Sequence, residues 1–142
     1  MKILISGNKN KDDFYVFLNE VCSYILKNYN IEVRIDQHVK HRKISNLYKF
    51  DKIYTRKNKY DLLISIGGDG SILSCVRRMK NNQIPIFGIH IGNLGFLNHC
   101  NKKSYKKFFT KIFNDDNISY SKHRLIGASF YNENKKKISI VS

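Results

Sequence analysis

The sequence has no long hydrophobic run. Its first residues, Met1–Gly7, hold an apolar stretch far too short for a signal peptide or a membrane span, and no later stretch is longer. Cysteine is also scarce: Cys22, Cys75 and Cys100 lie far apart, without CxxC spacing. Scattered cysteines in odd number fit a reducing cytosol better than a disulfide framework. We therefore expect a cytoplasmic protein with no membrane partner.

Several familiar catalytic patterns are missing. No GK[ST] tripeptide marks a P-loop, and no nucleophile elbow supports Ser/His/Asp or Cys/His catalysis. Internal repeats are absent, and the single proline, Pro85, stands where a strand is expected to begin, a position that tolerates proline.

Acidic residues are few, and the net charge is +15. The excess is mostly lysine, spread along the chain and accompanied by abundant isoleucine and asparagine, the residues that A/T-rich codons encode. Composition thus explains the charge, and we expect no dedicated nucleic-acid partner. Hydrophobic residues make up 42% of the 142 residues, enough for one domain with a real core.

Short apolar runs alternate with stretches of helical spacing. This pattern predicts an α/β fold, a doubly wound parallel sheet of Rossmann-like type with right-handed crossovers and helices on both faces. The stretch from Asp36 to Tyr60 is polar and weakly periodic, and predicts no clear element. The expected strands are Lys2–Ser6, Ile31–Ile35, Asp61–Ile66 and Ile84–Ile89, and the expected helices are capped by Asp12 or Asp13, by Ser71 and by Ser104.

The pattern changes after Asn117. Two β-type stretches, 118–131 and 137–141, are joined by the turn-prone Asn132-Glu133-Asn134, with no helix between them. We predict a domain division into an α/β catalytic-loop domain at 1–117 and the first strands of a β-rich domain at 118–142. Because a lone hairpin is marginal in water, the second domain is expected to be truncated.

The most informative segment is Gly67-Gly68-Asp69-Gly70-Ser71. Glycines let the backbone turn sharply and approach a ligand closely, and N–H groups at a helix start favour phosphate. The segment lacks the third glycine of a dinucleotide fingerprint. An alternative interpretation is a plain strand-to-helix turn with Asp69 as a cap.

A second glycine-rich segment follows the next strand, at Gly88–Asn98 (GIHIGNLGFLN). Both segments should reach the same rim of a parallel sheet, where ligands bind. Within the second one, Phe96 is either a platform for a base or ring, or a core residue.

Together, GGDGS and GIHIGNLGFLN resemble the NAD kinase family, over roughly Asp61 to Asn98. GGDG alone also occurs in lipid kinases of the diacylglycerol type and in phosphofructokinases, whereas GNLGFL discriminates against them. The resemblance implies that Asp69 is the catalytic base. It would accept the proton of the 2′-hydroxyl of the adenosine ribose of NAD, which attacks the γ-phosphate of ATP, or of polyphosphate, to give NADP.

The resemblance also implies a binding site. Gly67, Gly68, Asp69 and Gly70 would bind nucleotide, Phe96 would lie beside it, and Mg²⁺ would offset developing charge. Family members form homo-oligomers, which we expect of the complete protein. No protein metal ligand is assigned: Asp36, His38 and His41 have ligand-like spacing, but form one short cluster, which we interpret as a solvated segment.

The sequence differs from the family pattern at Ser74, has a less common residue at His90, and lacks one expected element. Many members carry Arg or His where this chain has Ser74, so a ligand contact is expected to be lost; His90 stands where Asn is common. The family's Asn-Glu or Asn-Asp element should follow Ser142, and Asn132-Glu133 is interpreted as a turn instead. Two alternatives stay open: an inactive fragment that only binds nucleotide or a partner, and a GGDG-type lipid or sugar-phosphate kinase.

Overall fold

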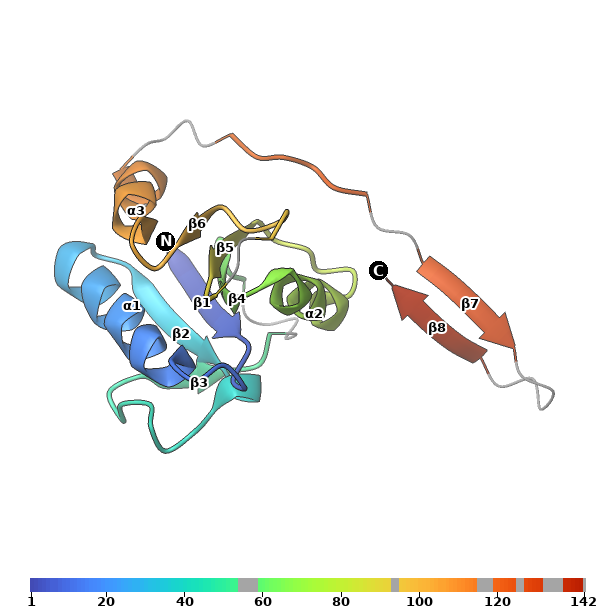
Figure 1. The fold of residues 1–142 in the computed structure, drawn as a ribbon, viewed down its shortest axis with the longest axis horizontal. Coiled ribbons are helices and arrows are strands. Elements are labelled where there is room, and N and C mark those ends of the chain that lie inside the picture. Colours follow the sequence, from blue (N-terminus) through green and yellow to red (C-terminus); the bar gives the residue numbers. More distant parts are fainter. Residues whose placement is uncertain (54–58, 93–94, 115–118, 125–126, 132–136, 142) are drawn as a thin grey trace.

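The computed structural model describes residues 1–53, 59–92, 95–114, 119–124, 127–131 and 137–141, the last two ranges as backbone only. Strands and helices alternate through most of this chain (Figure 1). The elements are β1 (Lys2–Gly7), α1 (Phe14–Asn28), β2 (Glu32–Asp36), the 3-10 helix η1 (Gln37–Val39), β3 (Lys49–Asp51), β4 (Leu62–Gly67), α2 (Asp69–Met79), β5 (Ile86–His90), β6 (Cys100–Asn101), α3 (Tyr105–Asn114), β7 (Gly127–Tyr131) and β8 (Lys137–Val141).

The first six strands form one parallel sheet in the order β3-β2-β1-β4-β5-β6. Strand β1 lies in the middle, with β2 on one side and β4 on the other, so the strand order reverses between β1 and β4. This arrangement is the doubly wound α/β fold that the sequence predicts, and such folds generally bind ligands at the point where the strand order reverses. Strands β7 and β8 pair with each other, antiparallel, in a separate sheet.

Each face of the large sheet has its own apolar core, because side chains alternate along a strand. Ile3 and Ile5 pack in one core with residues of α1 and α3, whereas Leu4 packs in the other with residues of α2. The helices on the two faces of the sheet can be followed in Figure 1. The first core is extensive and rich in aromatic rings; the second is smaller and includes Cys75 and Met79 of α2, whose Ile72 is also buried. Helices therefore cover both faces, as expected.

Helix α2 begins earlier than predicted. Gly68, in an extended conformation, occupies the N-cap position, and the helix starts at Asp69. The backbone N–H of Ser71 already donates to the carbonyl of Gly68, so Ser71 lies in the first turn and is not the cap. The predicted cap of α1 is likewise only partly right: Asp13 is the N-cap residue, but makes no capping hydrogen bond and pairs with Lys102 at 2.9 Å.

The stretch that the sequence left unassigned contains η1 and the short edge strand β3. β3 spans only Lys49–Asp51 and pairs with β2 alone, which explains why its pattern is too short to recognise. The predicted strand at 118–131 is shorter in the structure, where 119–124 has no regular structure and β7 starts at Gly127. The predicted turn Asn132-Glu133-Asn134 lies outside the described residues.

Candidate nucleotide site

The ends of β1 and β4 meet at the carboxyl edge of the sheet. The backbone N–H of Asn8 donates to the carbonyl of Ile66 at 2.9 Å, and a Cβ atom on Gly7 would collide with that carbonyl. Because β1 leads into α1 on one face and β4 into α2 on the other, this edge is the position where doubly wound folds generally bind ligands.

The glycines of the GGDGS loop have different surroundings. Gly67 has a φ of +152°, and a Cβ atom there would collide with the Ser71 hydroxyl, so the turn itself requires glycine. A Cβ atom on Gly68 or Gly70 would meet nothing within 4 Å. At these two positions the lack of a side chain leaves the backbone open to an approaching group, at the start of a helix whose N–H groups favour anions.

Asp69 connects the two glycine-rich segments. Its Oδ2 accepts a hydrogen bond from the backbone N–H of Phe96 at 2.7 Å, and its Oδ1 accepts from the backbone N–H of Leu97 at 3.0 Å and from Asn98 Nδ2 at 2.8 Å. The first turn of α2 and the segment after β5 therefore meet at one carboxylate. The prediction that the two segments share one rim is confirmed.

These contacts control the ionisation of Asp69. Desolvation raises the pKa of its carboxyl, but the hydrogen bonds from Leu97, Phe96 and Asn98 outweigh it, and the net pKa lies below the ordinary value of 3.8. A carboxylate offers about four lone-pair positions. With Oδ1 accepting two bonds and Oδ2 one, Oδ2 keeps the capacity to accept a further hydrogen bond.

Gly95 packs against this carboxylate. A Cβ atom on Gly95 would collide with the carboxyl group of Asp69, which explains the glycine at that point of the second segment. Phe96 is fully exposed, so it is not the core residue that was one of its two interpretations. Sequence reasoning quoted Gly95 and Asn98 within the motif but gave neither a role. Asn93 and Leu94 lie outside the described residues.

His90 and Ser74 lie near the site without contacting Asp69. His90, at the end of β5, is buried, and its Nδ1 lies 2.9 Å from the carbonyl of Gly92, to which it donates. His90 therefore stabilises the backbone at Gly92, where the second segment leaves β5. The same segment is tied to the first by the N–H of Ile91, which donates to the carbonyl of Gly67 at 3.2 Å. Ser74 is half-buried in α2.

The Asp36, His38 and His41 cluster is not a solvated segment throughout. Asp36 is 2% exposed and accepts hydrogen bonds from Ser6 and from the backbone of His38. The His41 ring stacks on Tyr15 instead. Within the described part of the chain, no group of three or more His, Cys, Asp or Glu side chains is placed to hold a metal ion.

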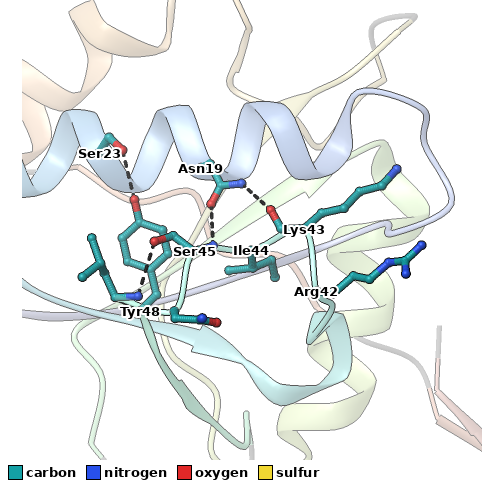
Figure 2. Close-up of a pocket in the computed structure, with 9 residues that line it drawn as sticks. Asn19, Ser23, Arg42, Lys43, Ile44, Ser45 and Tyr48 are labelled. Atoms are coloured by element: carbon teal, nitrogen blue, oxygen red, sulfur yellow. Dashed lines mark hydrogen bonds between the residues drawn. The ribbon is translucent and has the colours of Figure 1, made fainter.

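Two hollows lie elsewhere on the surface, and neither includes Asp69. The first, about 450 Å³, lies between α1 and the segment at 42–48 (Figure 2). Its polar groups bond to one another: Asn19 donates to the carbonyl of Lys43 at 2.9 Å, and Ser23 contacts the Tyr48 hydroxyl at 3.0 Å. The second, about 440 Å³, lies beside η1 and the last turn of α2.

Fold and loops together define a doubly wound α/β domain with an acidic, glycine-rich loop at its switch point. The chain matches the ATP-NAD kinase N-terminal domain over residues 3–118. It therefore belongs to the NAD kinase family. None of the helices in the described ranges is long and apolar enough to cross a membrane.

Individual relatives agree with this assignment. An NAD kinase of Sulfurimonas denitrificans is 40% identical over 93 residues, which is 66% of this chain and 32% of the relative. One of Flavobacterium johnsoniae is 28% identical over 147 residues, covering 98% of this chain and 49% of the relative. The chain thus spans half or less of the length of these relatives.

The fold has a counterpart among solved structures. The crystal structure of yeast NADH kinase complexed with NADH superimposes with a TM-score of 0.78 at 20% sequence identity. The match covers all of this chain and 46% of the yeast chain. At this identity the likeness establishes the fold, which agrees with the parallel sheet described above.

Proposed function

We propose that this chain forms the catalytic-loop half of an NAD kinase site. The observation that supports the proposal is the Asp69 carboxylate, which lies where the two glycine-rich segments meet and retains one acceptor position on Oδ2. Family membership supplies the substrate class: NAD as acceptor, and ATP, or polyphosphate, as phosphoryl donor.

The reaction follows from that acceptor position. The 2′-hydroxyl of the adenosine ribose of NAD donates a hydrogen bond to Asp69, and its oxygen attacks the γ-phosphorus of ATP. A bond forms between the 2′-oxygen and phosphorus, the bond between the γ-phosphorus and the bridging oxygen breaks, and ADP leaves. Asp69 takes the hydroxyl proton. Its low pKa keeps it ionised and ready to accept, although it is then a weak base. Positioning therefore contributes more to the rate than basicity.

The neighbouring residues support binding. Gly68 and Gly70 leave open backbone at the start of α2, where phosphate oxygens would meet N–H groups. Gly67 shapes the turn, and the exposed Phe96 ring is free to pack beside a nucleotide. Mg²⁺ would neutralise phosphate charge. A magnesium ion commonly keeps several waters and binds substrate phosphates, and we assign it no protein ligand.

Other properties complete the proposal. We place the protein in the cytoplasm, supported by its three free, buried cysteines, and assign no nucleic-acid or membrane partner. The division at 117/118 is supported by the separate pairing of β7 with β8. Homo-oligomer formation follows from the resemblance to the family.

The test is formation of NADP from NAD, ATP and Mg²⁺, measured with an NADP-specific dehydrogenase. If wild type turns over, Asp69→Asn should lose at least about 100-fold of that rate, the usual contribution of a positioned acid or base. Asp12→Asn, at an exposed carboxylate before α1, is the matched control and should keep the wild-type rate.

Each failure of this test has a distinct meaning. No turnover by wild type, with nucleotide still bound, would favour the alternative of a chain that only binds nucleotide. Equal rates for wild type and Asp69→Asn would remove Asp69 from the mechanism. Phosphorylation of a lipid or sugar phosphate, but not of NAD, would favour the other GGDG-type kinases.

A further inference from the structure

A partly buried polar cluster lies near the carboxyl ends of β1 and β2, on the α2 face of the sheet. Asp36, at the end of β2, is 2% exposed, and its Oδ2 accepts a hydrogen bond from the Ser6 hydroxyl at 2.6 Å. The same oxygen forms an ion pair with Nη1 of Arg78, whose Nη2 lies 3.0 Å from the Ser6 oxygen. Three side chains from β1, β2 and α2 therefore close one ring of contacts, which we call the Arg78 cluster.

The cluster lies directly behind the candidate site. Ser6 is the residue before Gly7, and it pairs in register with Ser65, two residues before Gly67. Arg78 comes from the last turn of α2, but helical side chains lean toward the helix N-terminus, so its guanidinium reaches back toward this edge. The cluster thus joins the strand ends at this edge to the helix that begins at Asp69.

Apolar side chains hold helix α2 on the sheet, with Cys75 and Met79 against Leu4, Leu63 and Tyr60, and Ile72 is buried as well. Apolar contacts are non-directional, so they do not by themselves fix the angle of a helix on its sheet. A buried carboxylate, in contrast, requires a partner in a fixed position, since an unpaired buried charge is costly. The ion pair therefore adds a directional constraint to the apolar contact.

We propose that Arg78 is a positioning residue. Together with Asp36 and Ser6 it fixes the angle of α2 on the sheet, and so holds the Asp69 carboxylate against the backbone N–H groups of Phe96 and Leu97. The inference rests on the proposed function only in naming Asp69 as the group that meets the substrate. The geometric part stands without it.

The neighbouring arginine provides a matched control. Arg77 is exposed in the same turn of α2, and both arginines complement the helix dipole there. A role in neutralising the helix end would be common to Arg77 and Arg78. Only Arg78 contacts Asp36 and Ser6.

The experiment compares the full chain with Arg78→Met, Arg78→Lys and Arg77→Met, without any ligand. NMR measures solvent exchange of the Phe96 and Leu97 amides, the two backbone donors to Asp69, and the pKa of the Asp69 carboxyl. Arg78→Met should speed exchange of both amides by about tenfold or more through local opening, and raise the Asp69 pKa toward its ordinary value. Arg78→Lys keeps the positive charge but not the planar guanidinium that contacts Asp36 and Ser6 through two nitrogens. Its amide exchange rates and its Asp69 pKa should therefore lie between those of wild type and of Arg78→Met. Arg77→Met should match wild type.

The contrary results are equally specific. Unchanged exchange at Phe96 and Leu97, or an increase confined to residues next to the cluster such as Ser6 and His38, would overturn the proposal. So would a uniform increase in all amides, which would indicate general destabilisation. If Arg78→Met does not fold, the proposal is tested by comparing amide exchange at Phe96 and Leu97 between Arg78→Lys and Arg77→Met. Because these readouts need no substrate, a failed NADP assay would refute the proposed function and leave this inference standing.

Discussion

Asp69 has two tasks that a single carboxylate can perform together. It accepts hydrogen bonds from Phe96, Leu97 and Asn98, which anchors the second segment, and it retains an acceptor position that our proposal assigns to a substrate hydroxyl. The GGDGS pattern predicted Asp69 as the central residue. It could not predict the anchoring partners, because they lie 27 to 29 positions away and depend on how two loops meet in space.

The contact between Gly95 and Asp69 leads to a test at residue scale. Gly95→Ala should lower the free energy of unfolding by about 1–3 kcal/mol, because the new methyl group collides with the Asp69 carboxyl. Gly70→Ala, at a helical position with open space, should leave stability unchanged or raise it by up to about 1 kcal/mol. Urea unfolding measures both, and equal effects would contradict the described packing.

The pKa of Asp69 predicts a pH dependence of stability. Its folded pKa lies below the ordinary value of 3.8, so its hydrogen bonds stabilise the folded state at neutral pH. That contribution should be lost as the pH falls from above 3.8 through the lower folded pKa. The stability difference between wild type and Asp69→Asn should therefore shrink in acid. A difference that stays constant from pH 7 to strong acid would show that Asp69 is not anchored as described.

At the scale of elements, the strands that alternate or form continuous apolar runs were predictable. β1 and β4 are buried on both faces, so each is an almost unbroken hydrophobic segment that can be recognised in the sequence. The start of α2 was not predictable from Ser71, since an extended glycine takes the cap position. Edge strands β3 and β6 span only three and two residues, too few for a periodic signal.

Two phenylalanines provide a test at this scale. Phe109 of α3 is fully buried among the rings of Tyr105, Phe87 and Phe113, so Phe109→Ala should cost about 3–5 kcal/mol of stability. Phe96→Ala should change stability by less than about 0.5 kcal/mol, because that ring is fully exposed. Thermal or urea unfolding of both variants and of wild type measures the two losses of stability. A large loss for Phe96→Ala would contradict its placement at the surface.

At the scale of the whole molecule, the sequence pattern predicted an α/β domain with a packed core but not how polar its interior is. The Arg78 cluster places a carboxylate and a guanidinium under the sheet edge, although Asp36 belonged to a stretch that reads as solvated. Burial of charge depends on partners brought together from β1, β2 and α2. Pairing between residues that are distant in the sequence cannot be predicted from the residues around each one.

The cysteines give a test of the body as a whole. Burial raises the pKa of Cys22 and of Cys100 to about 12, and desolvation also raises the pKa of Cys75. In the native protein at pH 8, a thiol reagent should therefore label none of the three, and denaturant should expose all three. Rapid labelling of a native cysteine would show that the two cores are not closed as described.

The most direct test of the central claim is an NMR titration of the isotope-labelled chain with NAD and with ATP·Mg²⁺. The claim is that nucleotide binds where the two glycine-rich segments meet at Asp69. We predict that the backbone signals of Gly68, Gly70 and Phe96 shift in a saturable way, and that Asp69→Asn weakens the effect. Saturable shifts at the hollow between α1 and residues 42–48, with the glycine-rich segments unchanged, would contradict the account.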